Sequence, residues 1–486
     1  MAVESLKNKT VKGIAWSGTD NVIQFSITFL ISIILARLLS PNDYGLIGIV
    51  NIFISVCTVV INGGFSTALL RKKKINNDDY NTAFVVNLTL SLILYVLVFL
   101  LAPFVATFFE RNELLQLTRV TALSMIIGAV SVVHQTQLTK RIDFKSQAKV
   151  TAVSGLTSGV IGVVMALCNY GVWSLVAQML SMQLLRTLLL WLVNKWTPSF
   201  SFSQRSFLEL FGFGWKIMLS GVLDRLWIQL YQVVVGKFYS PDTLGQYTRA
   251  KQFSLLISEN LTNVIQRVTF PVLSDIQDER ERLIDVYRRM IKITMFVTFV
   301  SMIFLAAVAE PLIFCLIGEK WMEAAGYLPL ICITGMLYPL HAINLNMLQI
   351  QGRSDLFLGL EIVKKIIGIF PLVIGATIGI YPMLYVSVLI NILCYFINSY
   401  FPGKILGYTS VCQLKDVSTS FFVALIAIAP VYFFKYVNIS YWLVLPAQLF
   451  IGICLFLLIC SKLKLYEYIE LKSLLTIYLK KYYERK

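Results

Sequence analysis

Long apolar runs, separated by short charged connections, extend over almost the whole chain. A helix needs about 20 mostly apolar residues to cross the hydrocarbon core of a membrane, and on that criterion the sequence holds about fourteen such segments. The longest connection, around Asp275 to Arg289, is too short to hold a soluble domain. The expected fold class is therefore an all-α membrane protein whose function resides within or between helices. The predicted segments are 13–37, 44–68, 81–107, 115–138, 148–168, 171–193, 207–236, 243–270, 290–314, 324–349, 356–379, 382–403, 417–436 and 440–461.

Composition and charge support this interpretation. Hydrophobic residues make up 57% of the chain and charged residues 14%, whereas soluble domains are about 25% charged. The net charge of +16 does not require a nucleic-acid partner, because Lys and Arg collect in the cytoplasmic loops of membrane proteins. With the N-terminus inside, about 28 basic residues fall in cytoplasmic loops and tails and about five on the other side. The sequence predicts a multi-pass protein with both termini in the cytoplasm.

Residues for enzymatic chemistry are scarce. The eight cysteines form no C-x-x-C pair and there are only two histidines, so neither a zinc site nor His-based catalysis is indicated. The basic start resembles a signal peptide, but its apolar run continues past Asp20 and Gln24 without a cleavage site, which predicts a first spanning helix. A glycan polymerase or ligase would be expected to carry a large outer loop, and a glycosyltransferase an acidic cluster. Asp78-Asp79 is the nearest approach, and we interpret it as a helix cap. No cofactor is expected.

Two connections share one sequence pattern, which predicts an internal repeat. A basic residue, a Ser-Pro pair and a glycine recur at constant offsets after the first and the seventh segments. Helix capping explains one Ser-Pro pair, with Ser as the N-cap and Pro as the first helical residue. It does not explain why two such pairs occur, each after the first of six spans. The pattern predicts two six-helix lobes of the same orientation, related by an axis along the membrane normal, with a site between them. The matching residues are Arg37, Ser40, Pro41 and Gly45 with Lys237, Ser240, Pro241 and Gly245; Gly13 and Trp16 with Gly212 and Trp215; Gly155 and Gly159 with Gly375 and Gly379; and His134 with His341.

The repeat and the apolar runs together predict the domain organisation. Leucines, tyrosines and lysines in the C-terminal tail recur at roughly helical spacing, which favours an interfacial helix on anionic lipid over a solvated tail. The predicted parts are an N-lobe at 1–200, a C-lobe at 201–405, two further spans at 406–461 and the amphipathic tail at 462–486.

Charged residues inside the predicted spans are the candidate functional groups. Each costs about 2.5–3.5 kcal/mol at mid-membrane, so it should face a hydrated cavity or a partner. Some have local explanations: Arg186 and Arg267 can reach the surface, Glu361 can pair with Lys364 or Lys365, and Glu310 lies near a span end. The remaining surplus of cations predicts a cavity for an anionic, phosphate-bearing ligand, with an internal salt-bridge network as the alternative. The candidate ligand-binding residues are Arg225, Lys216, Arg249, Lys251 and Arg119.

A second set of polar residues has a different candidate role. Asp20, Gln24 and Thr28 recur every four residues, which makes a polar stripe on the first span. The stripe is a candidate for contacts with a coupling ion (H⁺ or Na⁺) or with sugar hydroxyls, and hydrogen bonding between helices is an equal alternative. The residues assigned to this role are Asp20, Gln24, Asp224 and Glu259.

Several stretches resemble motifs of the Wzx-type (WzxC-like) polysaccharide flippases of the multidrug/oligosaccharidyl-lipid/polysaccharide exporter superfamily. The run 169–178 is similar to their G-x-G-V-W-A-L-V-x-Q, with Asn169 where the family often has glycine. The run 37–45 resembles their R-L-L-S-P-x-D-Y/F-G opening, 143–145 their D-F-K/R, and 346–355 their N-x-L-x-x-x-G-R-S-D. The resemblance follows the chain in order and spacing over nearly its whole length.

That resemblance implies fourteen helices in a V-shaped, two-lobed arrangement in the bacterial inner membrane. It also implies a substrate: oligosaccharide units linked to undecaprenyl diphosphate, moved between leaflets for O-antigen, capsule or exopolysaccharide assembly. Expected partners are this glycolipid, membrane lipids, and a polysaccharide polymerase with its chain-length machinery, but no nucleic acid. Two alternatives share the fold: a flippase for peptidoglycan precursors, and a multidrug exporter, which would favour acidic rather than basic groups in its cavity.

Overall fold

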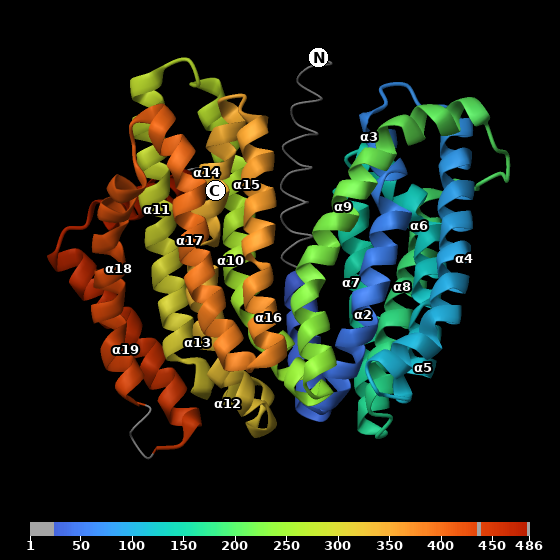
Figure 1. The fold of residues 1–486 in the computed structure, drawn as a ribbon, viewed down its shortest axis with the longest axis horizontal. Helices are drawn as coiled ribbons and strands as arrows, with labels where there is room; N and C mark the ends of the chain where they lie inside the picture. Colours follow the sequence, from blue (N-terminus) through green and yellow to red (C-terminus); the bar gives the residue numbers. More distant parts are fainter. Residues whose placement is uncertain (1–23, 435–438, 484–486) are drawn as a thin grey trace. The chain divides into compact units, whose positions relative to one another are not determined.

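In a computed structural model, the chain is described over residues 24–434 and 439–483, and all regular structure in these ranges is helical (Figure 1). The helices form two compact units, one ending at Gly245 and the other beginning at Gln246. Each of the predicted apolar segments coincides with one helix or with two consecutive helices over its described residues. The expected all-α membrane fold is confirmed.

Eleven helices in the described ranges are long and apolar enough to cross a membrane. The other three predicted segments differ from these for identifiable reasons. The first is described only over Gln24–Leu38, an apolar helix too short to be counted among the eleven. The eighth is rich in amides, hydroxyls and charges, and the eleventh is divided into two short helices at Gly368. The count of fourteen spans therefore stays a prediction.

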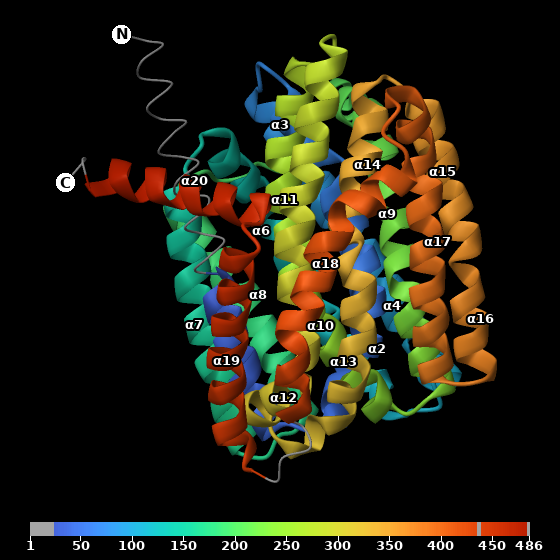
Figure 2. The same cartoon turned by 90° about the vertical axis from the view of Figure 1, so that its left-hand side faces the viewer.

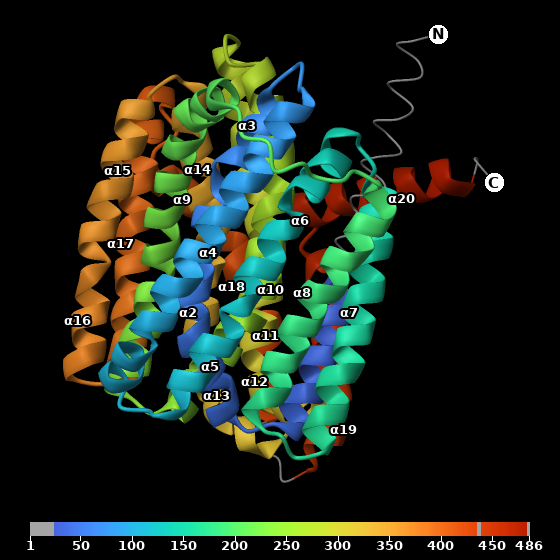
Figure 3. The same ribbon diagram turned by 90° about the vertical axis from the view of Figure 1, so that its right-hand side faces the viewer.

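In the first unit the helices pack mainly as antiparallel neighbours. Figure 3 shows α7 and α8 side by side along most of their length, as expected for two spans joined by a short turn at residues 168–171. Further along the unit α6 packs on α8 and on α4, and α2 packs along α9. Its helices are Gln24–Leu38, α2 (Pro41–Gly63), α3 (Phe65–Arg71), α4 (Asn77–Phe108), α5 (Glu113–Thr121), α6 (Leu123–Lys140), α7 (Phe144–Leu167), α8 (Val172–Asn194) and α9 (Gln204–Phe238).

In the second unit α11 is central, because both α13 and α18 pack along it. The predicted C-terminal tail is a helix, α20, and Figure 2 shows it lying crosswise to α19. Its contact with lipid stays a prediction. The helices of this unit are α10 (Pro241–Asp275, whose first turn belongs to the first unit), α11 (Arg280–Ala307), α12 (Ala309–Ile317), η1 (Glu319–Trp321), α13 (Met322–Met336), α14 (Tyr338–Ile350), α15 (Ser354–Ile367), α16 (Ile369–Thr377), α17 (Ile380–Leu406), α18 (Ser410–Phe433), α19 (Tyr441–Lys462) and α20 (Tyr466–Tyr483).

The repeated Ser-Pro pairs start helices as the sequence predicts. The backbone N–H of Asp43 donates to Ser40 Oγ at 3.2 Å, and Pro41 is the first residue of α2. In α10 the N–H of Thr243 donates to Ser240 Oγ at 3.1 Å, and that helix begins with proline as well. Each serine therefore satisfies an otherwise unpaired N–H of the first helical turn.

The other marks of the repeat hold only in part. A Cβ on Gly155 or Gly159 would stand 3.1 and 2.1 Å from the side chains of Ile27 and Ile31, so this pair does let α7 approach the helix Gln24–Leu38 closely. The second pair does not act this way, because Gly379 precedes α17 in an extended turn instead of continuing a helix. The packing of α9 on α2 puts the seventh span in the first compact unit, so the predicted lobe boundary at residue 200 and the predicted two-fold relation remain predictions from the sequence repeat.

Candidate functional site

Two of the candidate cations lie on opposite faces of α9. Lys216, Ser220 and Asp224 recur every four residues and are exposed or nearly so. Arg225 is half-buried and shares a face with Gln229, whose side-chain amide donates to Ser55 Oγ of α2 at 2.8 Å. Nine residues correspond to two and a half turns of an α-helix, which puts Lys216 and Arg225 about 180° apart. Thus α9 by itself does not bring these two cations together.

Neither of these two cations is neutralised by a carboxylate in the described part of the chain. The ion pairs of these ranges involve other residues. The salt-bridge network that the sequence left open as an alternative is therefore not built around Lys216 or Arg225. A half-buried guanidinium on a helix apolar enough to cross a membrane is costly unless water or an anion meets it, so Arg225 remains the best-supported candidate.

The candidate cations of α10 belong to the second unit. Arg249 is only 5% exposed; its Nη1 donates to Gln252 Oε1 at 2.7 Å, and its guanidinium carbon lies 5.5 Å from the centre of the Trp321 ring. Lys251 is half-buried, with its Nζ 6.0 Å from the Tyr247 ring. Since Arg249 is held inside the unit by these contacts, its first role is in packing.

Arg119, from α5, lines a pocket of the first unit. Its guanidinium lies 4.1 Å from the centre of the Phe99 ring, and its Nε donates to the Phe99 carbonyl at 3.4 Å. Trp173, from the stretch that resembles the flippase motif, lines the same pocket. An arginine beside aromatic rings suits a ligand with both an anionic group and a flat or apolar face. The pocket has a volume of about 270 Å³ and is lined by Tyr95, Phe99, Gln116, Arg119, Val120, Leu123 and Trp173.

The predicted polar stripe is described only in part. Asp20 lies outside the described residues, whereas Gln24 and Thr28 are exposed on the helix Gln24–Leu38. Asp224 and Glu259, the other two residues assigned to ion or glycan contacts, are exposed as well. The four residues of this set therefore stay candidates.

The residues with local explanations behave largely as expected. Glu361 Oε1 pairs with Lys364 Nζ at 2.5 Å, one turn further along α15. Arg186 Nη2 donates to Gln135 Oε1 of α6 at 2.6 Å, so this guanidinium also joins two helices. The side chain of Arg267 lies outside the described ones.

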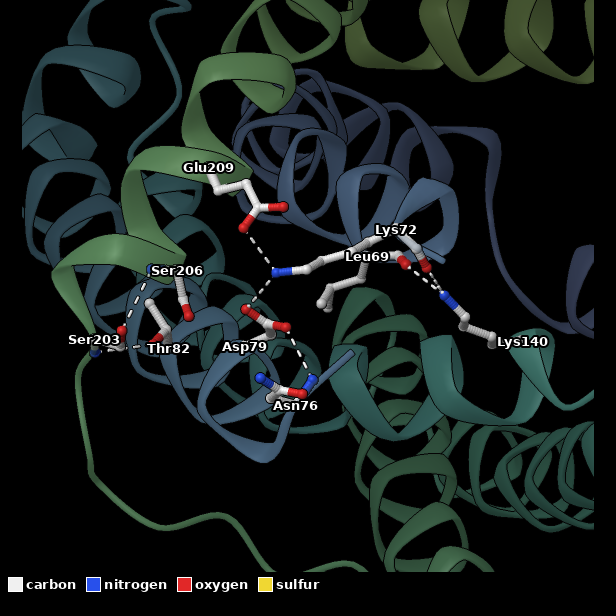
Figure 4. A network of polar contacts seen from close by, with 9 residues as sticks. All are labelled: Leu69, Lys72, Asn76, Asp79, Thr82, Lys140, Ser203, Ser206 and Glu209. Carbon is white, nitrogen blue, oxygen red and sulfur yellow. Dashed lines mark hydrogen bonds and ion pairs between the residues drawn. The ribbon is translucent and has the colours of Figure 1, made fainter. Parts of the chain in front are cut away.

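A polar network at one end of the first unit was missed from the sequence (Figure 4). Lys72, counted above only as a loop cation, places its Nζ 3.0 Å from Asp79 Oδ1 and 2.8 Å from Glu209 Oε2. Burial lowers the pKa of Lys72, but its hydrogen bonds to Glu209 and Asp79 outweigh this effect and raise it. Asp79 also accepts from the N–H of Asn76 at 3.0 Å, which confirms that it caps α4.

The same network joins further segments. Lys140, at the end of α6, donates to the carbonyls of Leu69 and Lys72, and the N–H of Ser203 donates to Thr82 Oγ1 at 3.0 Å. In Figure 4 these groups tie α3, α4, α6 and the start of α9 together. Part of the basic excess therefore holds the helix ends in place. A sequence pattern could not reveal this because the partners are up to 137 residues apart.

A second missed group lies in the second unit around His341, which the sequence marked only as part of the repeat. Its ring contacts the side chains of Asn391 and Asn398. The available signal was an ionisable residue within a span, because such residues are rare in membranes unless they have a function.

A family model described as polysaccharide biosynthesis protein matches residues 34–326. The chain belongs to this family. It is 27% identical over 301 residues to the teichuronic acid biosynthesis protein TuaB of Bacillus subtilis, an alignment covering 61% of this chain and 62% of TuaB. It is 27% identical to the succinoglycan biosynthesis transport protein ExoT of Rhizobium meliloti, over 68% of this chain and 67% of ExoT. It is 23% identical to the lipopolysaccharide biosynthesis protein WzxC of Escherichia coli, over 81% of each chain.

Solved structures share the fold. The lipid II flippase MurJ, in an inward closed conformation, superposes with a TM-score of 0.74 at 14% identity, covering 92% of this chain and 98% of MurJ. An inward-facing multidrug resistance MATE family transporter of the MOP superfamily gives 0.55 at 16% identity, covering 86% and 99%. The expected superfamily fold and the resemblance to WzxC-like proteins are thereby confirmed.

Proposed function

We propose that this protein is a flippase that moves oligosaccharide units linked to undecaprenyl diphosphate across the bacterial inner membrane, toward the outer leaflet. The units would serve O-antigen, capsule or exopolysaccharide synthesis. It acts as a transporter and not as an enzyme, in keeping with a multi-pass chain of the polysaccharide biosynthesis family.

The half-buried Arg225 is the observation that carries this proposal. A guanidinium on a membrane-crossing helix with no carboxylate partner in the described ranges needs an anion or water to offset its burial. A diphosphate matches this need, because the planar guanidinium binds phosphate oxygens through two parallel hydrogen bonds. The exposed ammonium of Lys216, on the other face of α9, adds positive potential along the same helix.

The relatives support a lipid-linked glycan as the substrate. Their names concern teichuronic acid, succinoglycan and lipopolysaccharide, which are different polymers. The shared requirement is therefore a carrier-linked unit and not a particular sugar. An intramembrane cation such as Arg225 suits the diphosphate of such a carrier better than the positively charged drugs expected for a multidrug exporter.

The orientation and the partners belong to the proposal. We place both termini in the cytoplasm because the loops on that side hold most of the Lys and Arg. This puts the Lys72 network at the cytoplasmic end of the first unit. A polysaccharide polymerase with its chain-length machinery would then receive the unit on the outer side.

The test is deletion of the gene followed by complementation. Without the protein, lipid-linked units should accumulate on the cytoplasmic face and surface polymer should be lost. Arg225→Ala should restore little polymer although the protein inserts at normal abundance, and Arg225→Lys should restore part of it. Normal polymer with Arg225→Ala would remove Arg225 from the site.

A reconstituted system separates the alternatives. Vesicles containing the purified protein should move a fluorescent or chemically tagged lipid-diphosphate glycan between leaflets. Efflux of a cationic dye without glycolipid movement would instead establish a drug exporter.

A further inference from the structure

His341 of α14, in the second unit, contacts two side-chain amides of α17. Asn398 Nδ2 is 2.9 Å from His341 Nδ1, and Asn391 Oδ1 is 3.4 Å from His341 Nε2. Asn398 is only 1% exposed, whereas His341 and Asn391 are half-buried. The ring is therefore half-buried and contacts an amide through each of its two nitrogens.

These contacts define the protonation state of the ring. An amide N–H donates to Nδ1, so Nδ1 has no proton and the neutral ring carries its hydrogen on Nε2, facing the Asn391 oxygen. The Oδ1 of Asn398 is buried and has no hydrogen-bond partner within the described part of the chain. Such an unpaired buried oxygen is destabilising.

Proton uptake would give this oxygen a partner and turn the amide N–H groups toward its former position. When a proton adds to Nδ1, the bond from Asn398 Nδ2 breaks, a half-turn of the amide brings Oδ1 to the ring, and Nδ1–H donates to it. Nε2–H keeps its bond to Asn391. Both ring nitrogens of His341 thus have partners in the neutral and in the protonated state. The two states differ in one hydrogen bond between α14 and α17.

Burial and one charged neighbour both oppose an imidazolium at this position. That neighbour is Lys364, whose own charge is paired with Glu361. The carboxylates of Glu361 and Glu259 both act on the hydroxyl of Tyr338, one turn before His341. Glu259, a candidate for ion coupling from the sequence, thus belongs to the same surroundings. The helices that pack on α14 are α11, α13, α15 and α17. Their titratable side chains include Tyr287 on α11, Cys332 on α13, Glu361, Lys364 and Lys365 on α15, and Cys394 on α17, and α14 itself carries Tyr338.

His134, the equivalent residue in the repeat, has different surroundings. It is fully buried, its ring stacks on Trp191 with centroids 4.8 Å apart, and its Nε2 donates to the Trp196 carbonyl at 3.0 Å. The carbonyl accepts only, and Nδ1 has no partner from the described side chains. A protonated His134 would carry a buried, unsatisfied N–H, so this ring stays neutral.

We propose that His341 is a proton-binding site that gains and loses a proton during transport. The side-chain amide of Asn398 turns over each time the protonation state of the ring changes. The coupling part of this inference rests on the proposed transport function; the proton site itself does not. The rearrangement supplies a two-state contact between two helices of one unit, which is what an ion needs in order to bias a conformational equilibrium.

Nitrogen-15 labelling of histidine tests the site directly in the full-length protein, reconstituted in bilayers. The chain has only two histidines, so the spectrum contains the nitrogen signals of two imidazole rings, and His341→Gln assigns them by leaving those of His134. When the pH is lowered from about 8 to about 4, the His341 signal should begin to change from neutral toward imidazolium while that of His134 stays neutral. A His341 ring that remains neutral throughout overturns the proposal.

Asn398 supplies the second variant. Asn398→Leu removes the acceptor for Nδ1–H and should move the His341 titration at least tenfold in proton concentration toward acid. Asn398→Asp should move it in the opposite direction. An unchanged His341 titration in both variants, with the helical content of the protein intact, would show that the Asn398 amide does not respond to protonation of the ring.

Glycolipid movement in vesicles tests the coupling. In the wild type a pH gradient should change the direction or rate of movement, and His341→Gln should abolish this response while downhill exchange continues. Absence of any glycolipid movement in the wild type would refute the proposed function, and the nitrogen-15 titration would still decide the proton site. Movement that ignores the gradient in the wild type would refute the coupling alone.

Discussion

Gly45 of α2 lies against the main-chain carbonyl of Pro241: a Cβ on Gly45 would stand 1.7 Å from that oxygen. The relation is reciprocal, because a Cβ on Gly245 would stand 2.0 Å from the carbonyl of Pro41. The two copies of the sequence pattern therefore pack on each other through their prolines and glycines. The repeat recorded in the sequence is a repeat of this contact.

Alanine at Gly45 or Gly245 should destabilise the protein. The clash is with backbone, which cannot move aside as a flexible side chain can, so we expect a loss of about 1–3 kcal/mol and a lower unfolding temperature. Gly212→Ala is the matched control, since no atom lies within 4 Å of a Cβ there and alanine favours a helix. Thermal unfolding in detergent measures all three variants. Equal unfolding temperatures would contradict the contact.

Lys72→Met should loosen the end of the first unit that Figure 4 shows. The substitution keeps the length of the side chain but leaves Asp79, which is 1% exposed, without its cation, at a cost of about 1–3 kcal/mol. Lys73→Met, at an exposed position one residue further on, is the control. Hydrogen exchange of residues 69–82 should rise in the first variant only. Identical exchange in both would mean that the ion pairs at Lys72 contribute nothing.

The same lysine predicts a dependence on alkaline pH. Because the hydrogen bonds to Glu209 and Asp79 raise its pKa against the opposing effect of burial, its stabilisation is complete below the ordinary lysine value of about 10.4. It is lost as the pH rises through the higher value of the folded state. The difference in unfolding temperature between wild type and Lys72→Met should therefore stay constant up to about pH 10 and shrink above it. A difference that grows with pH would give the wrong sign.

Two carboxylates should hold α20 in place. Glu470 pairs with Arg289 and Glu467 Oε1 lies 3.4 Å from Lys292 Nζ, both on α11, and the two acids are only 8% and 5% exposed. The double variant Glu467→Gln, Glu470→Gln should release α20 and make residues 466–483 more sensitive to protease, as should high salt in the wild type. Lys472→Gln, an exposed change on the same helix, should not. Unchanged cleavage in the double variant would show that apolar contacts alone hold α20.

The local elements were largely predictable. Hydropathy located the apolar segments, and the Ser-Pro pairs located two helix starts, because both depend on residues within a few positions of one another. The predictions weakened where a partner lay far along the chain. Gly212 was paired with Gly13 by sequence, yet the close backbone approach to α2 and α3 is made by Gly214, which lies against Gly64.

The candidate site shows the same division between local and distant effects. The sequence identified Arg225 and Arg249 as equivalent intramembrane cations, but the fold gives them different surroundings. Arg249 is held on Gln252 and Trp321, whereas Arg225 has no carboxylate partner among the described residues. His134 and His341 occupy corresponding spans and also differ. Residue type sets the cost of burial, and only the packed neighbours decide how that cost is offset.

The sequence by itself determined that this is a multi-pass helical protein of a polysaccharide family with a surplus of cations in its spans. These properties follow from transfer free energies and helix capping, which are summed along the chain. Only the tertiary structure decided which glycines carry backbone contacts, which lysines hold helix ends together, and which histidine can accept a proton. Those outcomes depend on groups more than fifty residues apart meeting within hydrogen-bonding distance, and no local pattern specifies such a meeting.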